Sequence, residues 1–394
     1  MERLRQIPWG ALRAEVALPA IARALDGAPA EREVDRALRA HRDLDARQRA
    51  AVAEAIFGVA LWRRRLAWET RAAGVPAPAT LLASLLRDLG GVPERRAFDL
   101  AGVCSVPRRA EPPRRLADRW SLPDWLEAHL AVELGDAAEA FCAAIAVPGP
   151  VFLRTNRLLC TREELAVRLA AEGIATVPTA RAPDGLRVAS PRANLFGAAA
   201  WREGWFEPQD EGSQLLGRLV EAQPGETVLD LCAGAGGKSL LLAAQRAHVL
   251  AWDVDRGRLQ RLRARAARAR AADLIEIVEQ PRPADRVLVD APCSELGILR
   301  RGPDARWRID PRALESLPLV QRELLELAAP LARRRLVYGT CTLHRAENEE
   351  LAAAFDRAHP EFRRMTTFRT LPHADDMDGF FAAVWDRIGS RGPT

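Results

Sequence analysis

The sequence predicts a doubly wound α/β core that follows an all-helical N-terminal region and a small α+β segment. From residue 213 onward, apolar runs such as ETVLDLC, HVLAWDV and RVLVDAP alternate with segments of helical spacing. This alternation is typical of a largely parallel sheet with helices on both faces. Residues 1–142 instead carry apolar side chains at helical spacing, with Gly and Pro at the breaks and almost no strand pattern.

The segment between these two parts has mixed character. The prolines and glycine of AVPGP mark a boundary, and a strand-like run follows them. Thr161 and Glu164 have capping-box spacing at the start of a helix. A strand, a turn at residues 183–185 and a second strand complete the segment. We therefore expect domains at 1–142, 146–212 and 213–394.

The composition of the chain limits the classes of protein to which it can belong. The 394 residues are 48% hydrophobic and 28% charged, without an apolar run of membrane-spanning length or a signal-peptide pattern. Six scattered cysteines show no paired C-x-x-C spacing, which argues against a metal site and a disulfide framework. We expect a cytoplasmic, metal-free monomer that does not bind membranes. The net charge of +5 suits a polyanionic partner.

The stretch CAGAGGKS holds Lys238, the only lysine of the chain. A phosphate-binding P-loop, and with it a nucleotide hydrolase, is disfavoured because Cys232 stands where the first glycine belongs. A dinucleotide fingerprint lacks its third glycine, at Ser239. An S-adenosylmethionine loop fits better, with an acid, Asp253, 19 residues after Gly234 to bind the ribose. A plain tight turn between strand and helix remains the alternative.

Two cysteines, Cys293 and Cys341, each end a predicted strand of this sheet, and Cys293 follows an Asp-Ala-Pro sequence. Carbon 5 of a pyrimidine accepts a methyl group only after a thiolate adds to carbon 6, and an acid near N3 steadies the charge that develops. Two thiols and the carboxylate of Asp290 suit that reaction. The other cysteines outside the glycine loop are expected to be small buried hydrophobic residues.

The chain resembles the RsmB-type RNA cytosine-5 methyltransferases of the Sun/Nop group. The resemblance covers residues from about 150 to 388 and rests on LRTNRL, WFEPQDEGSQL, VLDLCAGAGGKS, AWDVDRGRL, DAPCSELGILRR, YGTCTLHRAENE and DGFFAAVW, in family order. It implies a Rossmann-like class I methyltransferase core, an RNA-binding α+β subdomain and a NusB-like RNA-binding domain formed by the N-terminal helices. RNA, by preference 16S ribosomal RNA, would be the substrate and S-adenosyl-L-methionine the cofactor.

The resemblance also implies roles for single residues. Cys341 would attack C6 and Cys293 would aid release; the reverse assignment stays open, because DNA cytosine-5 enzymes use the cysteine of a Pro-Cys motif. Lys238 and Asp290 would lie where cofactor and base meet. The residues expected to bind the cofactor are Cys232, Ala233, Gly234, Ala235, Gly236, Gly237, Lys238, Asp253 and Asp290.

Arginines and one asparagine are expected to bind RNA phosphates and sugars. These candidates are Arg154, Asn156 and Arg157, together with Arg300 and Arg301. Six arginines between residues 258 and 270 lie in one predicted helix, for which a solvated surface is the favoured interpretation.

One departure from the family pattern concerns the adenine pocket. The family's Gly-Asp after the third strand of the core is missing, and Glu279 or Gln280 is the available substitute. The alternatives to a ribosomal RNA enzyme are a non-catalytic RNA-binding assembly factor and a transfer RNA cytosine-5 methyltransferase.

Overall fold

The structure, a computed structural model, describes residues 2–71, 74, 76–190, 193–302 and 304–389. The chain forms two compact units. Unit 1 comprises Met1–Pro148 and Leu299–Pro311, and unit 2 comprises Gly149–Ile298 and Arg312–Thr394. The segment Leu299–Pro311 lies within the range expected for the methyltransferase core, yet it packs with the helical unit.

Helices account for all regular structure in the described residues of unit 1. The longest, α4, starts at a capping box in which the Asp45 carboxylate accepts backbone N–H groups and Gln48 reaches back to Asp45 N. Its apolar side chains, among them Ile56, Trp62 and Leu66, form the centre of the core. The helices are α1 (Glu2–Arg5), α2 (Ala14–Leu25), α3 (Ala30–Ala40), α4 (Ala46–Glu69), α5 (Pro78–Ser84), α6 (Glu94–Ala101), α7 (Leu116–Trp120), α8 (Asp124–Leu134), α9 (Ala138–Ile145) and α15 (Ala305–Arg308).

Arg306 on α15 explains why Leu299–Pro311 joins this unit. Its side chain is fully buried and donates hydrogen bonds to the backbone oxygens of Ile145 (2.9 Å) and Trp120 (3.2 Å). Burial lowers the pKa of Arg306 to about 10. Asp304 accepts a hydrogen bond from Ala30 N at the start of α3, so two side chains of the segment hold helices distant in sequence.

A four-stranded antiparallel sheet opens unit 2, in the order β2-β3-β1-β4. The predicted capping box is present: Thr161 Oγ1 accepts from Glu164 N, and Glu164 Oε2 accepts from Thr161 N. The strand–turn–strand prediction also holds, since β2 and β3 pair across residues 179–184. The elements are β1 (Phe152–Thr155), α10 (Arg162–Ala171), β2 (Thr176–Pro178), β3 (Gly185–Val188), α11 (Ala199–Arg202) and β4 (Phe206–Pro208).

The second sheet of unit 2 has seven strands in the order β10-β11-β9-β8-β5-β6-β7. The five strands from β9 to β7 are parallel, and the hairpin of β10 and β11 adds an antiparallel edge. The strands are β5 (Thr227–Asp230), β6 (His248–Ala251), β7 (Ile275–Ile277), β8 (Ala284–Asp290), β9 (Ala332–Thr340), β10 (Phe362–Thr370) and β11 (Phe380–Arg387).

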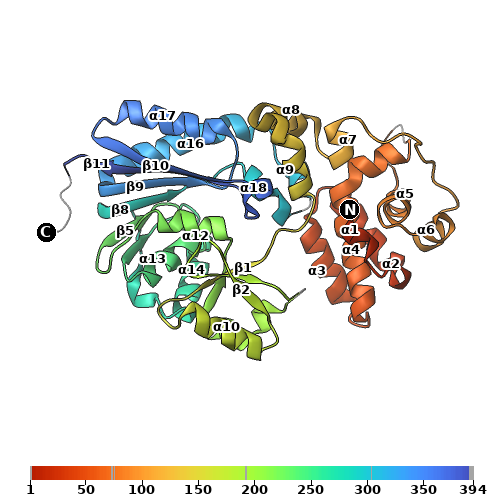
Figure 1. The fold of residues 1–394 in the computed structure, drawn as a ribbon, viewed down its shortest axis with the longest axis horizontal. Coiled ribbons are helices and arrows are strands. Elements are labelled where there is room, and N and C mark those ends of the chain that lie inside the picture. The colour runs from red at the N-terminus through yellow and green to blue at the C-terminus, as the bar shows by residue number, and fades with distance from the viewer. Residues whose placement is uncertain (1, 72–73, 75, 191–192, 303, 390–394) are drawn as a thin grey trace. The chain divides into compact units, whose positions relative to one another are not determined.

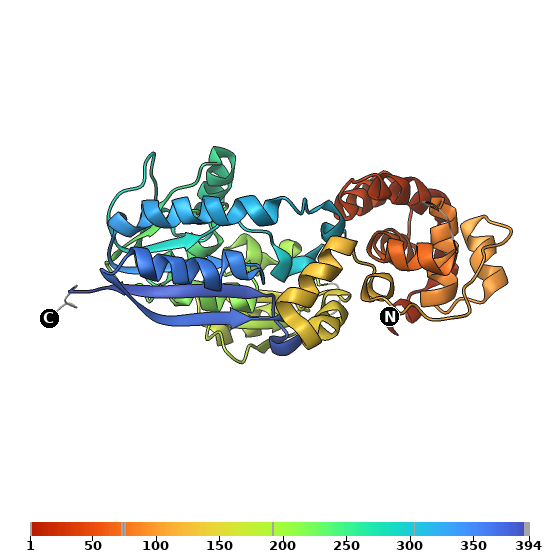
Figure 2. The ribbon, with the colours of Figure 1, turned by 90° about the horizontal axis from the view of Figure 1, so that it is seen from above.

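Helices cover both faces of this sheet (Figure 1). On one face lie α12 (Glu211–Arg218), α13 (Gly237–Ala244) and α14 (Arg256–Arg268), and on the other lie α16 (Ala313–Ala328) and α17 (Glu349–Ala358). The last two run side by side, as the light blue and mid blue helices of Figure 2 show. A short helix, α18 (Pro372–Asp375), joins β10 to β11. The expected fold class is confirmed.

The topology brings the candidate residues to one edge of the sheet. Because β5, β6, β8 and β9 are parallel neighbours, the loops that follow them lie at their common carboxyl end. Asp230, Asp253, Asp290 and Cys341 stand at the ends of those four strands. Among the described helices, none is long and apolar enough to cross a membrane.

Candidate active site

The loop from β5 to α13 needs glycine at two positions. Gly234 and Gly236 have φ angles of +54° and +86°, in the left-handed region that side chains disfavour. A Cβ on Gly236 would also lie 2.1 Å from Leu262 Cδ1. Gly237 differs, because a Cβ there would have Gln209 Nε2 as its nearest neighbour, at 3.9 Å. The loop therefore needs Gly236 for close packing against α14, whereas the backbone at Gly234 and Gly237 has room beside it for a bulky ligand.

Asp253 follows β6 and closes this loop from the side. Its Oδ2 accepts a hydrogen bond from Gly234 N at 2.8 Å, and its Oδ1 accepts one from Asp255 N at 2.7 Å. Each carboxylate oxygen keeps a further lone pair for a ribose hydroxyl. The glycine cradle and this carboxylate together fit the nucleoside end of S-adenosylmethionine.

The start of the loop is buried. Asp230 is almost fully enclosed, and burial raises its pKa to about 7, while the hydroxyl of Ser239, 2.6 Å away, acts in the opposite sense. Burial also raises the pKa of Cys232. The backbone oxygen of Ala235 accepts a hydrogen bond from Arg265 Nη1 at 2.6 Å, and Ala233 is buried. Cys232 to Gly237 thus contribute backbone rather than reactive side chains.

Lys238 and Asp290 form an ion pair at the start of α13. Lys238 Nζ lies 2.7 Å from Asp290 Oδ2 and 5.8 Å from the centroid of the Phe380 ring. The lysine side chain is 8% exposed, whereas that of Asp290 is 33% exposed. The pair therefore places a fixed positive charge under a carboxylate that remains accessible from solvent. A compact ammonium suits this enclosed position better than a planar guanidinium.

Cys293 and Cys341 are in contact. Their sulfur atoms lie 3.3 Å apart, and Cys341 N donates to Cys293 Sγ, also at 3.3 Å. The hydrogen bond with Cys293, followed by burial, raises the pKa of Cys341 well above its usual range. The two thiols are close enough to exchange one proton directly.

A buried polar network behind the thiols holds both cysteine loops. Glu347 is fully buried and accepts hydrogen bonds from Ser294 N (3.0 Å), Ser294 Oγ and Gln321 Nε2 (2.7 Å). Ser294 Oγ also meets Thr342 Oγ1 at 2.7 Å, so residues adjacent to the two cysteines are joined. The family motif YGTCTLHRAENE contains Glu347, but nothing in the sequence assigned it a role.

Two glycines allow the loops to pass closely. Gly297 N donates to Cys341 O, and Gly379 N donates to Gly297 O, both at 2.9 Å. A Cβ on Gly297 would lie 2.1 Å from Gly379 O. Neither glycine was predicted from the sequence to have a role, although each lies within a family motif, DAPCSELGILRR or DGFFAAVW.

The structure corrects the expected RNA-binding role of Arg154 and Asn156. Arg154 is buried, and its Nη1 donates to Gly237 O (2.6 Å) and Gln209 Oε1 (2.5 Å). Burial lowers the pKa of Arg154 to about 10. Asn156 Nδ2 donates to the backbone oxygens of Gly204 (2.9 Å) and Ala269 (2.8 Å). Both side chains support neighbouring backbone, and neither presents its polar end to solvent.

The remaining candidates lie at different places. Arg157 is exposed and 3.6 Å from Asp184 Oδ1, so RNA contact remains a prediction for it. Arg300 and Arg301 belong to unit 1, where Arg300 is buried and Arg301 exposed. Both line a hollow of about 260 Å³ in that unit, with Phe57 and Trp62.

Glu279 and Gln280, the proposed substitutes for the missing adenine acid, follow β7 and are exposed. The backbone oxygen of Glu279 accepts a hydrogen bond from Trp252 Nε1 at 3.2 Å. This bond ties the loop after β7 to the residue before Asp253. Both side chains remain available to a ligand.

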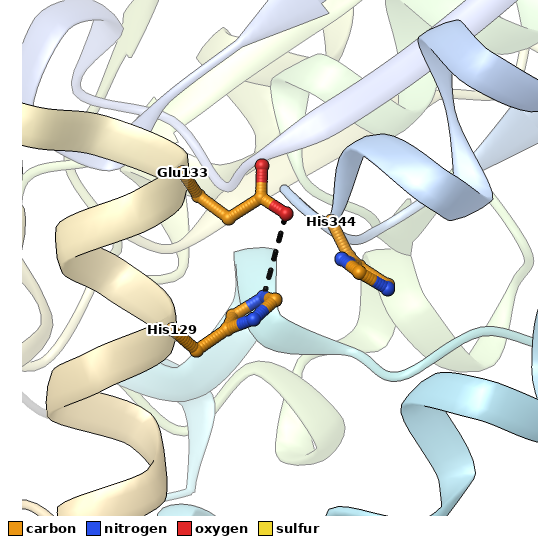
Figure 3. A group of neighbouring side chains, drawn as sticks. All are labelled: His129, Glu133 and His344. Atoms are coloured by element: carbon orange, nitrogen blue, oxygen red, sulfur yellow. Dashed lines mark ion pairs between the residues drawn. The ribbon is translucent and has the colours of Figure 1, made fainter.

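Histidine and carboxylate side chains meet on α8. His129 and Glu133 are one turn apart, with His129 Nε2 3.7 Å from Glu133 Oε1 (Figure 3). His344, also drawn there, follows β9 and belongs to unit 2. Two ligands on one helix turn do not make a metal centre.

Comparisons with known proteins agree with this geometry. A profile of the family described as 16S rRNA methyltransferase RsmB/F matches residues 218–386. A second profile, for the RsmF/B-like ferredoxin-like domain, matches residues 122–194. Ribosomal RNA small subunit methyltransferase B of Serratia proteamaculans is 34% identical over 67% of this chain and 66% of its own length. The probable ribosomal RNA small subunit methyltransferase B of Bacillus subtilis is 32% identical over 75% and 72%. The chain thus spans about two thirds of these relatives.

Solved structures share the fold. The crystal structure of the protein PH0851 superposes with a TM-score of 0.78 and 23% identity, over 97% of this chain and 99% of that one. NSun6 from Pyrococcus horikoshii gives a TM-score of 0.62 and 19% identity, over 68% and 99%. Fold, family profile and sequence identity lead to one conclusion: the chain belongs to the RsmB/F methyltransferase family.

Proposed function

We propose that this protein methylates carbon 5 of a cytosine in small-subunit ribosomal RNA, with S-adenosylmethionine as methyl donor. The observation that carries the proposal is the contact between Cys293 and Cys341, with sulfurs 3.3 Å apart, in a sheet whose neighbouring strand end holds Asp290 paired with Lys238. The names of the relatives support ribosomal RNA as the substrate.

The loop after β5 would hold the cofactor. Gly234 and Gly237 leave the backbone accessible to it, and Asp253 offers lone pairs to its ribose hydroxyls. When bound, S-adenosylmethionine supplies an electrophilic methyl group. Lys238 and Asp290 follow the cradle and meet the base, where the ammonium steadies the negative charge that develops on the ring and the carboxylate accepts a hydrogen bond from the amino group of the cytosine.

The thiols would perform addition and release. The Cys341 thiol gives up its proton to solvent, and the resulting thiolate sulfur bonds to C6 while the electron pair of the C5–C6 double bond moves to C5. After C5 has received the methyl group, the C5 proton leaves to solvent and the S–C6 bond breaks. The S–H group of Cys293 then hydrogen-bonds to the departing thiolate of Cys341, which aids its release.

The reverse assignment, with Cys293 as the nucleophile, also has structural support. Cys341 N donates a hydrogen bond to Cys293 Sγ, and the pKa of the Cys341 thiol is raised, which disfavours the thiolate form of Cys341. The family resemblance supports Cys341 as the nucleophile. A covalent complex distinguishes the two, because the variant without the releasing thiol accumulates it.

The test is incorporation of labelled methyl groups into unmodified small-subunit ribosomal RNA, with transfer RNA in parallel. Wild type and the control Cys104→Ala should yield 5-methylcytosine in ribosomal RNA. Cys104 is exposed, so the expectation that it is buried like Cys142 and Cys160 was wrong, and its thiol is a suitable control. Cys341→Ala should yield none. Cys293→Ala should retain RNA covalently on a denaturing gel.

Each other outcome has a definite meaning. A covalent complex with Cys341→Ala instead of Cys293→Ala reverses the roles of the thiols. Label in transfer RNA alone changes the substrate. Tight RNA binding without any methyl transfer identifies a non-catalytic assembly factor, for which the missing adenine acid would be the first explanation.

A further inference from the structure

A second feature of unit 2 combines aromatic and basic side chains outside the catalytic residues. It is a hollow of about 530 Å³ between the small sheet and α14, lined by Phe196, Trp201, Glu207, Pro208, Ala264, Arg265 and Arg268. We call it the Phe196 hollow. The catalytic proposal uses none of these side chains.

Phe196 is held outward as a platform. It lies in the 3₁₀ turn Leu195–Gly197, and its side chain is 62% exposed while its neighbour Leu195 is buried. Asn194 fixes the turn by accepting a hydrogen bond from Gly197 N at 3.1 Å. The Phe196 ring meets Trp201 edge-on, with centroids 5.2 Å apart. The ring contacts one aromatic neighbour and leaves much of its surface to solvent.

The opposite wall carries a stripe of arginines. Arg258, Arg261, Arg265 and Arg268 recur at intervals of three or four residues and therefore share one face of α14. Ala264 lies within this stripe, and its small side chain leaves room for the hollow. Arg261 is exposed, and no hydrogen bond or ion pair joins its side chain to any residue that the structure describes.

The inner arginines are fixed in place. Arg265 and Arg268 both pair with the buried carboxylate of Glu207. The Arg268 guanidinium stacks over the Trp201 ring at 4.4 Å from its centroid. One carboxylate shared by two guanidinium groups leaves net positive charge beside the aromatic rings. This charge favours an anionic ligand that also has a flat ring.

We propose that the Phe196 hollow binds an unpaired nucleotide of the RNA, with its base stacked on Phe196 and its phosphates along the arginine stripe of α14. Aromatic faces beside a basic groove are the usual means of holding single-stranded nucleic acid. The proposal rests on the proposed function in one respect, that the partner is RNA. It adds an anchor outside the thiols and the cofactor loop itself, although Arg265 of the hollow also donates a hydrogen bond to Ala235 O of that loop.

The test measures RNA affinity without catalysis, by fluorescence anisotropy with an unmodified small-subunit ribosomal RNA fragment. Phe196→Ala should weaken binding between about fivefold and a hundredfold, the range for removal of a base-stacking ring. Phe196→Trp should retain affinity, because it keeps a stacking face. Arg261→Gln should reduce the slope of affinity against salt by about one.

Matched controls lie on α16, which covers the opposite face of the large sheet. Leu327→Ala removes another exposed apolar side chain, and Arg322→Gln another exposed arginine. Both should bind RNA as the wild type does. Thermal unfolding and cofactor affinity of Phe196→Ala should equal those of the wild type, because Phe196 is exposed and lies outside the cradle.

Unchanged RNA affinity of Phe196→Ala would overturn the anchor, even in a protein that methylates RNA normally. Loss of affinity for an acidic peptide such as poly-glutamate, with RNA binding unchanged, would also overturn it and identify a protein-docking site. Failure of the proposed function itself shows separately, as absence of methyl transfer by the wild type.

Discussion

Substitution of alanine for Gly236 tests whether the loop after β5 is built as described. The new Cβ would lie 2.1 Å from Leu262 Cδ1, whereas carbon atoms pack at about 3.5–4.0 Å, so Leu262 must move by about 1.5 Å. Such overpacking costs roughly 1–3 kcal/mol. The φ angle of +86° adds about 1–2 kcal/mol for a residue with a side chain. The unfolding free energy should fall by roughly 2–5 kcal/mol.

The assay is thermal unfolding, with cofactor affinity measured by calorimetry below the transition. For a unit of this size, each kcal/mol corresponds to about 2–4 °C, so the melting temperature should drop by roughly 4–20 °C. Affinity for S-adenosylmethionine should fall as well. The control is Gly237→Ala, whose Cβ would meet no atom closer than 3.9 Å. The description of the loop would be refuted if both variants melted together with the wild type.

Three further predictions concern buried polar groups. Arg154→Ala should lower cofactor affinity and cost at least about 2 kcal/mol of stability, because Gly237 O loses a charged donor. Calorimetry measures the affinity and denaturant unfolding the stability. A change confined to the salt dependence of RNA binding would restore the RNA-contact interpretation. Asp230 has a pKa of about 7 in the folded protein, above the ordinary value of 3.8, so its contribution to stability is complete below about pH 4 and is lost as the pH rises through 7. The denaturant midpoint of Asp230→Asn should lack this pH dependence. Parallel curves of midpoint against pH for the two proteins would contradict the raised pKa of Asp230. Glu347→Gln should lower stability by about 1–3 kcal/mol and reduce the rate of methyl transfer, since an amide nitrogen would face donors. The control is Glu349→Gln, whose carboxylate is partly exposed and pairs with Arg369; it should leave the rate near that of the wild type.

Local signals predicted much of the fold. The apolar runs before Cys232, Asp253 and Cys293 became β5, β6 and β8, because buried parallel strands need continuous apolar sequence. The edge strand β10 was not predicted from the sequence. Its middle residues face solvent on both sides, so neither a continuous nor an alternating apolar pattern marks it.

Non-local contacts account for the errors. Arg154 and Asn156 are residue types usually found at the surface, yet the carbonyls that satisfy them belong to residues 83 and 113 positions further along the chain. Arg306 likewise bonds to a carbonyl 161 residues earlier, which draws Leu299–Pro311 into unit 1. A short stretch of sequence gives no indication of hydrogen-bond partners that lie so far away along the chain. The cysteine pair was predictable because both thiols end parallel neighbouring strands.

The hydrogen bonds that hold the cofactor loop limit how this protein can be engineered or can diversify. Arg154, on a strand of the small sheet, holds Gly237 O, and Arg265, which shares Glu207 with that sheet, holds Ala235 O. A foreign substrate-recognition subdomain transplanted in place of residues 149–208 would bring its own surface but would lack Arg154, the donor to Gly237 O, and Glu207, the carboxylate that pairs with Arg265. The small sheet is therefore not an interchangeable module, and chimeras that exchange it should carry Arg154 and Glu207 across the junction.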